Sequence, residues 1–381
     1  MDYCGGSWVE ISSARLKGNA EAVGRATGRG TEGVIAVVKA DAYGHGAAGV
    51  AAILREAGVR RFAVAYVAEG EEIRAAVPDA ALIFLLGRAT AADVPALRRG
   101  GITAAVVSTE HARELSAAAV ADGGGALPVH IKLDTGMGRL GFVCPAQVEE
   151  AVAALALPGL RVEGACMHFA KVEPEADPAW AAEQGRKFAE ATARLASAAG
   201  RPLFRHTSAT RAALLLEGSD YDAVRVGIAL YGYETAGVAG GRFETAPVLS
   251  WKTRVVQAKP VPAGFRCGYD ATWTARKPSL LATLAVGYAD GYRRTFGNTA
   301  EVLLHGVRCR VAGRVSMNWL IVDATPVAGR GEEVRPGDEA VLIGRQGPEA
   351  VWADELARID GTISYEILTS LSHRLERRTV C

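Results

Sequence analysis

A lysine at the end of an apolar run is the residue in this chain whose type and place most directly suggest chemistry. Lys39 follows the run Gly33 to Val38 and is followed at once by Ala-Asp-Ala-Tyr-Gly-His-Gly. Its four-carbon stem can lie along apolar surface, and loss of hydration there lowers the pKa of the amine. A neutral amine can form a Schiff base with a carbonyl compound. Most strand-end lysines are simply solvated charges, so the assignment depends on the rest of the chain.

Other polar side chains that can act as bases or anion ligands lie at or just beyond the ends of apolar, β-rich runs. They are Tyr43, Lys132, Asp134, Arg139, His168, His206, Thr210 and Arg225. Singly, each has a structural explanation, because a histidine can be a hydrogen-bonded core residue and an arginine can form an ion pair. Their repeated position at the end of a run favours one shared site.

Eight β-rich runs recur through the first part of the chain. They are Gly33 to Val38, Phe62 to Val67, Ala81 to Leu86, Ile102 to Val107, Val129 to Leu133, Val162 to His168, Phe204 to Thr207 and Ala223 to Ala229. Alanine-rich stretches with helical periodicity, such as Ala47 to Ala57 and Ala179 to Ala199, separate most of them. Alternation of strand and helix predicts a parallel sheet. Eight repeats favour a closed (β/α)8 barrel over an open doubly wound sheet, and a barrel gathers its active site at the carboxyl ends of its strands.

The pattern changes after Tyr233, where Gly237, Gly240 and Gly241 indicate a linker. We expect a barrel over residues 12–238 and a mainly β C-terminal domain over residues 239–381. The N-terminal strand 7–11 is expected to join that second domain, which makes it discontinuous.

Within the C-terminal domain, alternating residues predict strands over Trp251 to Val261 and Ala340 to Gly344. One helix is expected over Val351 to Ile359. The following segment, Thr362 to Leu371, is expected to be a strand.

Composition limits the function classes. The 381 residues are 49% hydrophobic and 22% charged with a net charge of +1, which gives no reason to expect a nucleic acid or an anionic membrane as partner. No signal peptide and no apolar stretch of about 20 residues is evident, so we expect a cytoplasmic protein that acts on a small molecule. The cysteines are scattered and predict reduced thiols rather than disulfides or a metal site. They are Cys4, Cys144, Cys166, Cys267, Cys309 and Cys381.

Across nearly its whole length the chain resembles the fold-type III pyridoxal-phosphate (PLP) enzymes, and among them the alanine racemase family. The motifs that carry the resemblance are AVVKADAYGHG from Ala36, HIKLDTGMGRLGF from His130, MHFA from Met167, VRVGIALYG from Val224, CGYDATWTA from Cys267, VGYADGY from Val286, GRVSMN from Gly313 and ISYEIL from Ile363. Their order and their spread over both expected domains make the resemblance specific.

The resemblance implies two catalytic bases. Lys39 matches the lysine that forms the Schiff base with PLP, and Tyr269 matches a second base that the other subunit contributes. One base removes the α-proton on one face of the substrate while the other returns a proton on the opposite face. The expected enzyme is therefore a homodimer with shared active sites that interconverts L-alanine and D-alanine.

The resemblance also implies a binding set for the cofactor. Arg225 matches the arginine that faces the pyridine nitrogen, and His168 matches the residue stacked on the ring. A guanidinium stays protonated, so it donates to that nitrogen, keeps it unprotonated and weakens the electron sink. The residues that match the phosphate site are Tyr43, Thr210, Gly227, Ile228 and Tyr365.

The substrate side of the resemblance rests on four positions. Arg139 matches an arginine that binds the phenolic oxygen of the cofactor and the substrate carboxylate. Met317 matches a residue of the second subunit whose backbone N–H binds that carboxylate, and Asn318 follows it. Lys132 matches a lysine that carries a carbamate derived from carbon dioxide in many relatives.

Three departures from the family pattern leave other activities open. Asn318 replaces a common aspartate, Ala209-Thr210 replaces Asn-Ser, and Asp270 replaces the glycine that commonly follows the catalytic tyrosine. Asn318 keeps a serine or broad-specificity amino-acid racemase as the alternative within the same class. A PLP-binding protein without racemase activity and a fold-type III decarboxylase are less favoured, because the former lacks the second domain and the latter requires a cysteine-aspartate motif.

Overall fold

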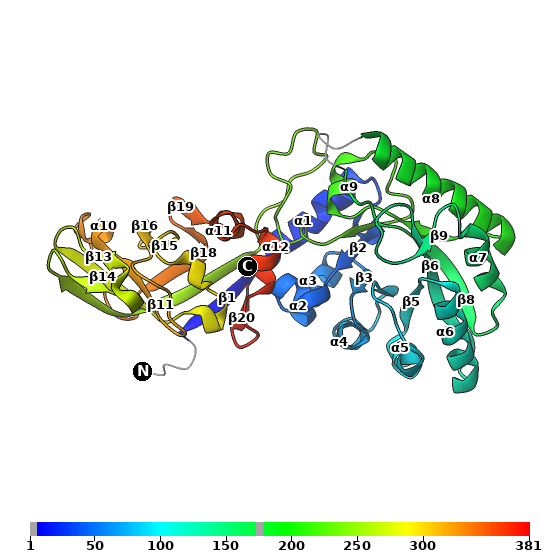
Figure 1. The fold of residues 1–381 in the computed structure, drawn as a ribbon, viewed down its shortest axis with the longest axis horizontal. Helices are drawn as coiled ribbons and strands as arrows, with labels where there is room; N and C mark the ends of the chain where they lie inside the picture. Colours follow the sequence, from blue (N-terminus) through cyan, green and yellow to red (C-terminus); the bar gives the residue numbers. More distant parts are fainter. Residues whose placement is uncertain (1–5, 173–177) are drawn as a thin grey trace. The chain divides into compact units, whose positions relative to one another are not determined.

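The structure, a computed structural model, describes residues 6–172 and 178–381 (Figure 1). The described chain divides into two compact units. The barrel unit comprises Arg15–Ala42 and Ala47–Ala246. The C-terminal unit comprises the described residues up to Ala14, together with Tyr43–Gly46 and Pro247–Cys381.

Eight parallel strands form the sheet of the barrel unit in the order β10-β2-β3-β4-β5-β6-β8-β9. Their bounds are β2 Val34–Val37, β3 Arg61–Val64, β4 Leu82–Leu85, β5 Ile102–Val106, β6 Leu127–Asp134, β8 Leu160–Cys166, β9 Phe204–His206 and β10 Val224–Val226. A parallel bridge between His206 and Ala223 joins the two ends of this order, so the sheet closes. The predicted (β/α)8 barrel is confirmed, and each predicted run overlaps one of the strands.

Helices alternate with these strands along the chain (Figure 1). The longer ones are α1 Ser13–Ala26, α3 Ala47–Glu56, α4 Val67–Ala76, α6 Thr109–Asp122 and α8 Pro178–Ala199. In α6, the Ser108 side chain accepts a hydrogen bond from the backbone of His111, and Gly123 ends the helix with a φ of 75°. Such an N-cap and a left-handed glycine at the end satisfy backbone groups that a helix leaves unpaired.

Strand β2 shows why short apolar runs predict this sheet. All four of its residues, Val34–Val37, are buried. A parallel strand in a barrel is covered on both faces, so it carries a continuous apolar run rather than an alternating one. The carboxyl end of this strand leads directly to Lys39.

A mainly β sheet forms the C-terminal unit, in the order β16-β15-β18-β11-β1-β20, with β14, β17 and β19 paired to its side. The bounds are β1 Ser7–Ser12, β11 Leu249–Val261, β14 Ser279–Leu284, β15 Glu301–Leu304, β16 Val307–Arg310, β17 Leu320–Asp323, β18 Glu339–Gln346, β19 Glu349–Val351 and β20 Glu376–Val380. Strand β1 pairs antiparallel with β11 and parallel with β20. The N-terminal strand therefore lies inside this sheet.

The expectation of a strand over Thr362 to Leu371 is wrong. Residues Ser364–Thr369 form helix α12, after helix α11 at Ala353–Asp360. Alternation of Ile363, Tyr365 and Ile367 suggested a strand, but the buried residues of α12 are Ser364, Ile367 and Leu368. That spacing of three and four is the period of a helix that buries one face.

Among the described residues, no helix is long and apolar enough to cross a membrane. Five cysteines in the described part of the chain are free thiols, namely Cys144, Cys166, Cys267, Cys309 and Cys381. Cys4 lies outside the described residues.

Candidate active site

Lys39 follows the barrel strand β2 and opens a left-handed turn. Ala40, Asp41, Ala42 and Tyr43 have φ values of 54°, 54°, 51° and 55°. Each non-glycine residue in this conformation costs roughly 1–2 kcal/mol. The Ala42 amide donates to the carbonyl of Val38 at 2.9 Å, which fixes the turn to the strand end. A strained backbone directly after a candidate catalytic lysine is typical of a functional site.

The ammonium group of Lys39 is disfavoured where it lies. Burial is the main cause that lowers the pKa of Lys39, and the charge of Arg139 lowers it further. Glu69 acts in the opposite direction and raises this pKa. The result is an amine that loses its proton more readily than an exposed lysine does.

Other cations of the barrel unit act on the same region. Burial lowers the pKa of Lys132 to about 8, and the charges of Arg225 and Arg139 contribute. The Lys132 side chain still keeps partial access to solvent. Lys39, Lys132, Arg139 and Arg225 thus form a group of cationic side chains that repel one another. Such a group fits anionic ligands.

Arg225 on β10 is buried and held by acceptors on both of its terminal nitrogens. Nη1 lies 2.7 Å from Nδ1 of His206 and donates to the His206 carbonyl at 2.6 Å. Nη2 donates to the carbonyls of Met167 and of Thr207. A guanidinium has five N–H donors, so Nε is the one left without an acceptor among the described residues. That donor is available to a ring nitrogen.

A pair of buried histidines continues this contact. The Nδ1 atom of His130 lies 2.9 Å from Nε2 of His206. Because Arg225 is a donor only, Nδ1 of His206 must accept, which leaves its Nε2–H to donate to His130. Burial, followed by the charge of Arg225, lowers the pKa of His130 to about 3 and holds that of His206 well below its usual range. Both rings are neutral.

His168 follows strand β8 and is also a neutral ring. Burial is the largest cause that lowers the pKa of His168 to about 3, and the charges of Arg225, Lys132, Arg139 and Lys39 add to it. Neutral histidines so close to cations are poor acids but suitable for stacking against a flat ring.

The glycine-rich loop after β6 is organised by Asp134. Its carboxylate accepts hydrogen bonds from the amides of Gly136 at 2.9 Å, Gly138 at 3.1 Å and Arg139 at 3.1 Å. Burial alone raises the pKa of Asp134, but these backbone donors lower it below its usual value. Gly138 has a φ of 70°, which explains the glycine there. The loop fixes the backbone that carries Arg139.

The candidate phosphate ligands of the barrel unit lie at strand ends. Thr210 begins the short helix α9, Thr210–Leu215, and its hydroxyl accepts a hydrogen bond from the amide of Ala229 at 3.4 Å. Gly227 and Ile228 directly follow β10. Two further candidates, Tyr43 and Tyr365, belong to the C-terminal unit, where their ring centroids are 5.8 Å apart.

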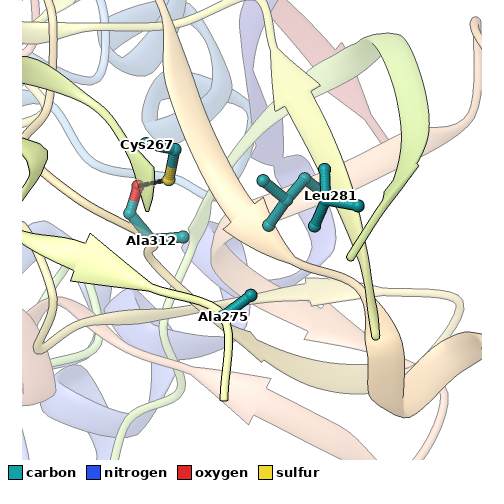
Figure 2. Close-up of a cluster of buried hydrophobic side chains, with 5 residues drawn as sticks. Cys267, Ala275, Leu281 and Ala312 are labelled. Carbon is teal, nitrogen blue, oxygen red and sulfur yellow. Dashed lines mark hydrogen bonds between the residues drawn. The ribbon is translucent and has the colours of Figure 1, made fainter. Parts of the chain in front are cut away.

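Tyr269 lies in the C-terminal unit on a strained turn. Gly268 has a φ of 74°, and Asp270 and Ala271 have φ values of 60° and 47°. The Tyr269 side chain is 64% exposed. Cys267, two residues before Tyr269, belongs to a small apolar cluster that also includes Ala275, Leu281 and Ala312 (Figure 2). The Cys267 thiol contacts the carbonyl of Ala312 at 3.7 Å within it.

Two polar contacts tie the Tyr269 turn to the segment around Gly313. Asn298 accepts from the Gly313 amide at 2.7 Å and donates from Nδ2 to the hydroxyl of Thr272 at 3.1 Å. Nε of Arg314 lies 3.0 Å from a carboxylate oxygen of Asp270, close enough for an ion pair but outside hydrogen-bond geometry. Asp270 therefore has a local countercharge.

Met317 and Asn318 form an exposed turn in the same unit. The backbone amide of Ser316 donates to the Trp319 carbonyl at 3.0 Å across that turn. The amide of Ala289 donates to the Met317 carbonyl, also at 3.0 Å. A Cβ on Gly287 would lie 2.3 Å from this carbonyl, so only glycine allows the approach.

Comparison with known proteins decides the family. The model of the alanine racemase N-terminal domain matches residues 11–235, and that of the alanine racemase C-terminal domain matches residues 248–379. The chain belongs to the alanine racemase family. The curated alanine racemase of Carboxydothermus hydrogenoformans is 39% identical over 374 residues, which cover 97% of this chain and 98% of the relative. The alanine racemase of Syntrophobacter fumaroxidans is 38% identical over 365 residues, which cover 96% of this chain and 95% of the relative.

Solved structures of alanine racemases share the fold of this chain over nearly its whole length. The crystal structure of the Bacillus anthracis enzyme with bound L-Ala-P has a TM-score of 0.89 at 32% identity and covers 100% of this chain and 96% of its own. The Bartonella henselae enzyme, solved with covalently bound pyridoxal phosphate, has a TM-score of 0.84 at 27% identity. The match covers 98% of this chain and 99% of the Bartonella chain. Alanine racemases are PLP-dependent isomerases, so the expected activity class and cofactor are confirmed.

The described residues fit PLP by the chemistry of their donors and charges. Arg225 retains an N–H suited to a ring nitrogen, and the surrounding cations suit a phosphate. Lys39 provides an amine whose pKa is lowered, and an amine must be neutral to react with a carbonyl group.

Of the site residues expected from the sequence, the structure places eight in the barrel unit, namely Lys39, Lys132, Arg139, His168, Thr210, Arg225, Gly227 and Ile228. Tyr269, Met317, Asn318 and Tyr365 lie in the C-terminal unit, and so does Tyr43, although its number lies within the range 12–238 expected for the barrel.

Four supporting residues of the structure were not expected from the sequence, namely Glu69, His130, Asn298 and Arg314. Glu69 carried one signal, since a glutamate three positions after a helix N-cap commonly binds backbone amides there. The other three depend on contacts between distant segments.

Proposed function

We propose that this chain interconverts L-alanine and D-alanine with two bases, Lys39 and Tyr269 of the partner subunit. The observation that carries the proposal is Lys39 itself, a partly buried amine with a lowered pKa at the carboxyl end of a barrel strand. Residues 12–238 would be the PLP-binding domain, and residues 239–381 with strand 7–11 would supply the second base.

Bound PLP supplies an electron sink for the charge left when the substrate α-proton departs. In this proposal, Lys39 removes or returns that proton on one face of the substrate. Tyr269 of the partner subunit acts on the other face. Opposed bases are required because a single base would return the proton to the face from which it came.

Arg225 sets how strong that sink is. Its guanidinium keeps its own proton because acceptors hold both terminal nitrogens. It would therefore donate through Nε without transferring a proton, and the sink stays weak. A weak sink disfavours side reactions that require a long-lived carbanion, which suits racemisation.

Exposure of Tyr269 supports a shared site. Its side chain is 64% exposed, and the C-terminal unit also exposes Met317, Trp319 and Ile363. Met317 and Trp319 share one exposed turn, and large apolar side chains that lie together at a surface are typical of a face that another molecule covers. A homodimer would cover them and bring Tyr269 to a second chain.

The remaining roles divide between the two ligands. The hydroxyls of Tyr43, Thr210 and Tyr365 and the amides of Gly227 and Ile228 would hold the phosphate, and His168 would stack on the ring. Arg139 and the backbone amide of Met317 of the partner subunit would bind the substrate carboxylate, because charge-assisted hydrogen bonds orient that group strongly. The location of the enzyme in the cytoplasm stays a prediction.

The proposal is tested on pure PLP-loaded protein. We expect the α-hydrogen of alanine to exchange with deuterated solvent. We also expect D-alanine to form from L-alanine, and L-alanine from D-alanine. PLP-loaded protein that does neither would contradict the proposal.

Asn318 supports a second candidate, a serine or broad-specificity racemase. It lies on the exposed turn beside Met317, where an aspartate would add a negative charge. Values of kcat/KM for alanine, serine and lysine decide between the candidates. A strong preference for alanine removes the second one, whereas equal values favour it.

A further inference from the structure

Glu69 connects the start of helix α4 to the residue that follows Lys39. We propose that Glu69 is a positioning residue for Lys39, one that fixes the left-handed turn and sets the charge around the amine. This inference rests on the proposed function only in giving Lys39 its catalytic role.

The contacts of the Glu69 carboxylate divide between its two oxygens. Oε1 accepts a hydrogen bond from the Ala40 amide at 2.7 Å. Oε2 accepts from the amides of Ala65 at 2.7 Å and Tyr66 at 3.1 Å. Three backbone donors on one carboxylate make charge-assisted bonds that define its position closely.

Only part of this arrangement is an ordinary helix cap. Tyr66 is the N-cap of α4 and Glu69 is its third residue, so the bond to the Tyr66 amide follows the usual capping pattern. The bond from Ala40 is different because it comes from the loop after β2, the strand that pairs in parallel with β3. Glu69 therefore joins the loops that follow two neighbouring barrel strands.

That bond acts at the point where the backbone is strained. Ala40 is the first of the consecutive residues with positive φ, directly after Lys39. Farther along, the Asp41 carboxylate accepts from the Ala47 amide at 2.8 Å. Without the Glu69 bond, the first peptide of the turn loses a fixed acceptor, and the direction in which Lys39 leaves the strand becomes less defined.

Glu69 also acts through its charge. The groups that act on the amine of Lys39 are Arg139, which opposes the ammonium form, and Glu69, which favours it. Glu69 thus offsets part of the effect of burial and of Arg139. Position and charge are partly separable, because Glu69→Gln removes the charge but keeps one acceptor oxygen, which can still accept from the Ala40 amide while the new NH2 group faces the Ala65 and Tyr66 amides. Glu69→Ala removes the charge and both acceptors.

Two measurements on the full-length chain test the inference. The first is hydrogen exchange of the Ala40 amide in the PLP-loaded protein, which we expect to be at least about tenfold faster in Glu69→Ala. The second is the pH dependence of the rate at which PLP reloads the chain. We expect its midpoint to fall in Glu69→Gln, because the charge that favours the ammonium form is gone.

Glu72→Gln is the matched control, because Glu72 is an exposed carboxylate on the same helix. It should leave both measurements at wild-type values. A general loosening of the site would hydrate Lys39 and raise the reloading midpoint, which is opposite to the expected direction. Wild-type exchange at Ala40 in Glu69→Ala, or an unchanged or raised midpoint in Glu69→Gln, would overturn the inference. Neither readout uses alanine, so failure to racemise alanine would contradict the proposed function alone.

Discussion

His206 accepts a hydrogen bond from Arg225 at 2.7 Å and contacts His130 at 2.9 Å through its other ring nitrogen. The guanidinium cannot accept a proton, so it dictates the tautomer of His206 and, through it, that of His130. The permanent charge of Arg225 also opposes protonation of either ring. A neutral histidine pair thus supports a charged arginine inside the barrel.

This pair predicts a pH dependence of stability. The folded pKa of His130 is about 3, well below the value near 6.5 of an unfolded chain. Its contribution is therefore fully present above about pH 6.5 and is lost as the pH falls toward about 3, because the unfolded chain binds the proton first. Each such histidine adds a slope of about 1.4 kcal/mol per pH unit. The free energy of unfolding, measured in urea at several pH values between 7 and 4, should therefore decrease as the pH is lowered below about 6.5.

His130→Gln tests the assignment through the slope and not through the absolute stability. The variant should lose about 1.4 kcal/mol per pH unit of that slope. His373→Gln, a change at an exposed histidine of the C-terminal unit, serves as the control and should keep the slope. An unchanged slope in His130→Gln would mean that His130 is not the neutral ring described above.

The sequence predicted the barrel because strands such as β2 are short, apolar and buried on both sides. It also placed Lys39 at a strand end. The left-handed turn was not predictable, since Ala40 to Tyr43 contain no glycine to indicate a positive φ. Nor was the bond between Glu69 and Ala40, which depends on β2 and β3 being neighbours. Helix α12 was missed because Ile363, Tyr365 and Ile367 alternate as a strand does.

Tyr269→Phe should separate the two proposed bases. The variant removes the phenol but keeps the ring, so PLP absorbance should stay. We expect proton abstraction to slow by more than about 100-fold for one enantiomer and much less for the other, because a positioned base contributes at that level. The measurement is the deuterium-exchange rate of each alanine enantiomer. Equal losses for both enantiomers would argue against the assignment.

A mixture of two inactive variants tests the shared site. Lys39→Ala and Tyr269→Phe each remove one base from every site of a homodimer. If Tyr269 acts across subunits, a mixed dimer contains one intact site. Random co-expression should then restore about one quarter of the wild-type activity. Activity no greater than the sum of the separate variants would place both bases in the same chain.

Asp270 should contribute little net stability. Asp270→Gly relieves a φ of 60°, worth about 1 kcal/mol, and loses an exposed ion pair with Arg314, worth about 0–1 kcal/mol. We expect the free energy of unfolding in urea to change by less than about 1 kcal/mol. Asp270→Ala keeps the strained conformation and loses the pair, so it should be less stable than Asp270→Gly. The reverse order would show that the strain relieved at position 270 is smaller than the conformational entropy that glycine adds to the unfolded chain.

Lys132 should react with carbon dioxide. Burial and the charges of Arg225 and Arg139 lower its pKa to about 8, so part of the amine is neutral in mildly alkaline buffer. A neutral amine adds to carbon dioxide, forms an N–C bond and releases a proton, and the resulting carbamate is an anion beside those cations. Protein equilibrated with carbon-13 bicarbonate should therefore give a carbamate signal in the carbon NMR spectrum. Lys132→Met should abolish that signal, whereas Lys187→Met, which removes a lysine that pairs with Glu183, should retain it. A signal that survives Lys132→Met would assign the carbamate elsewhere.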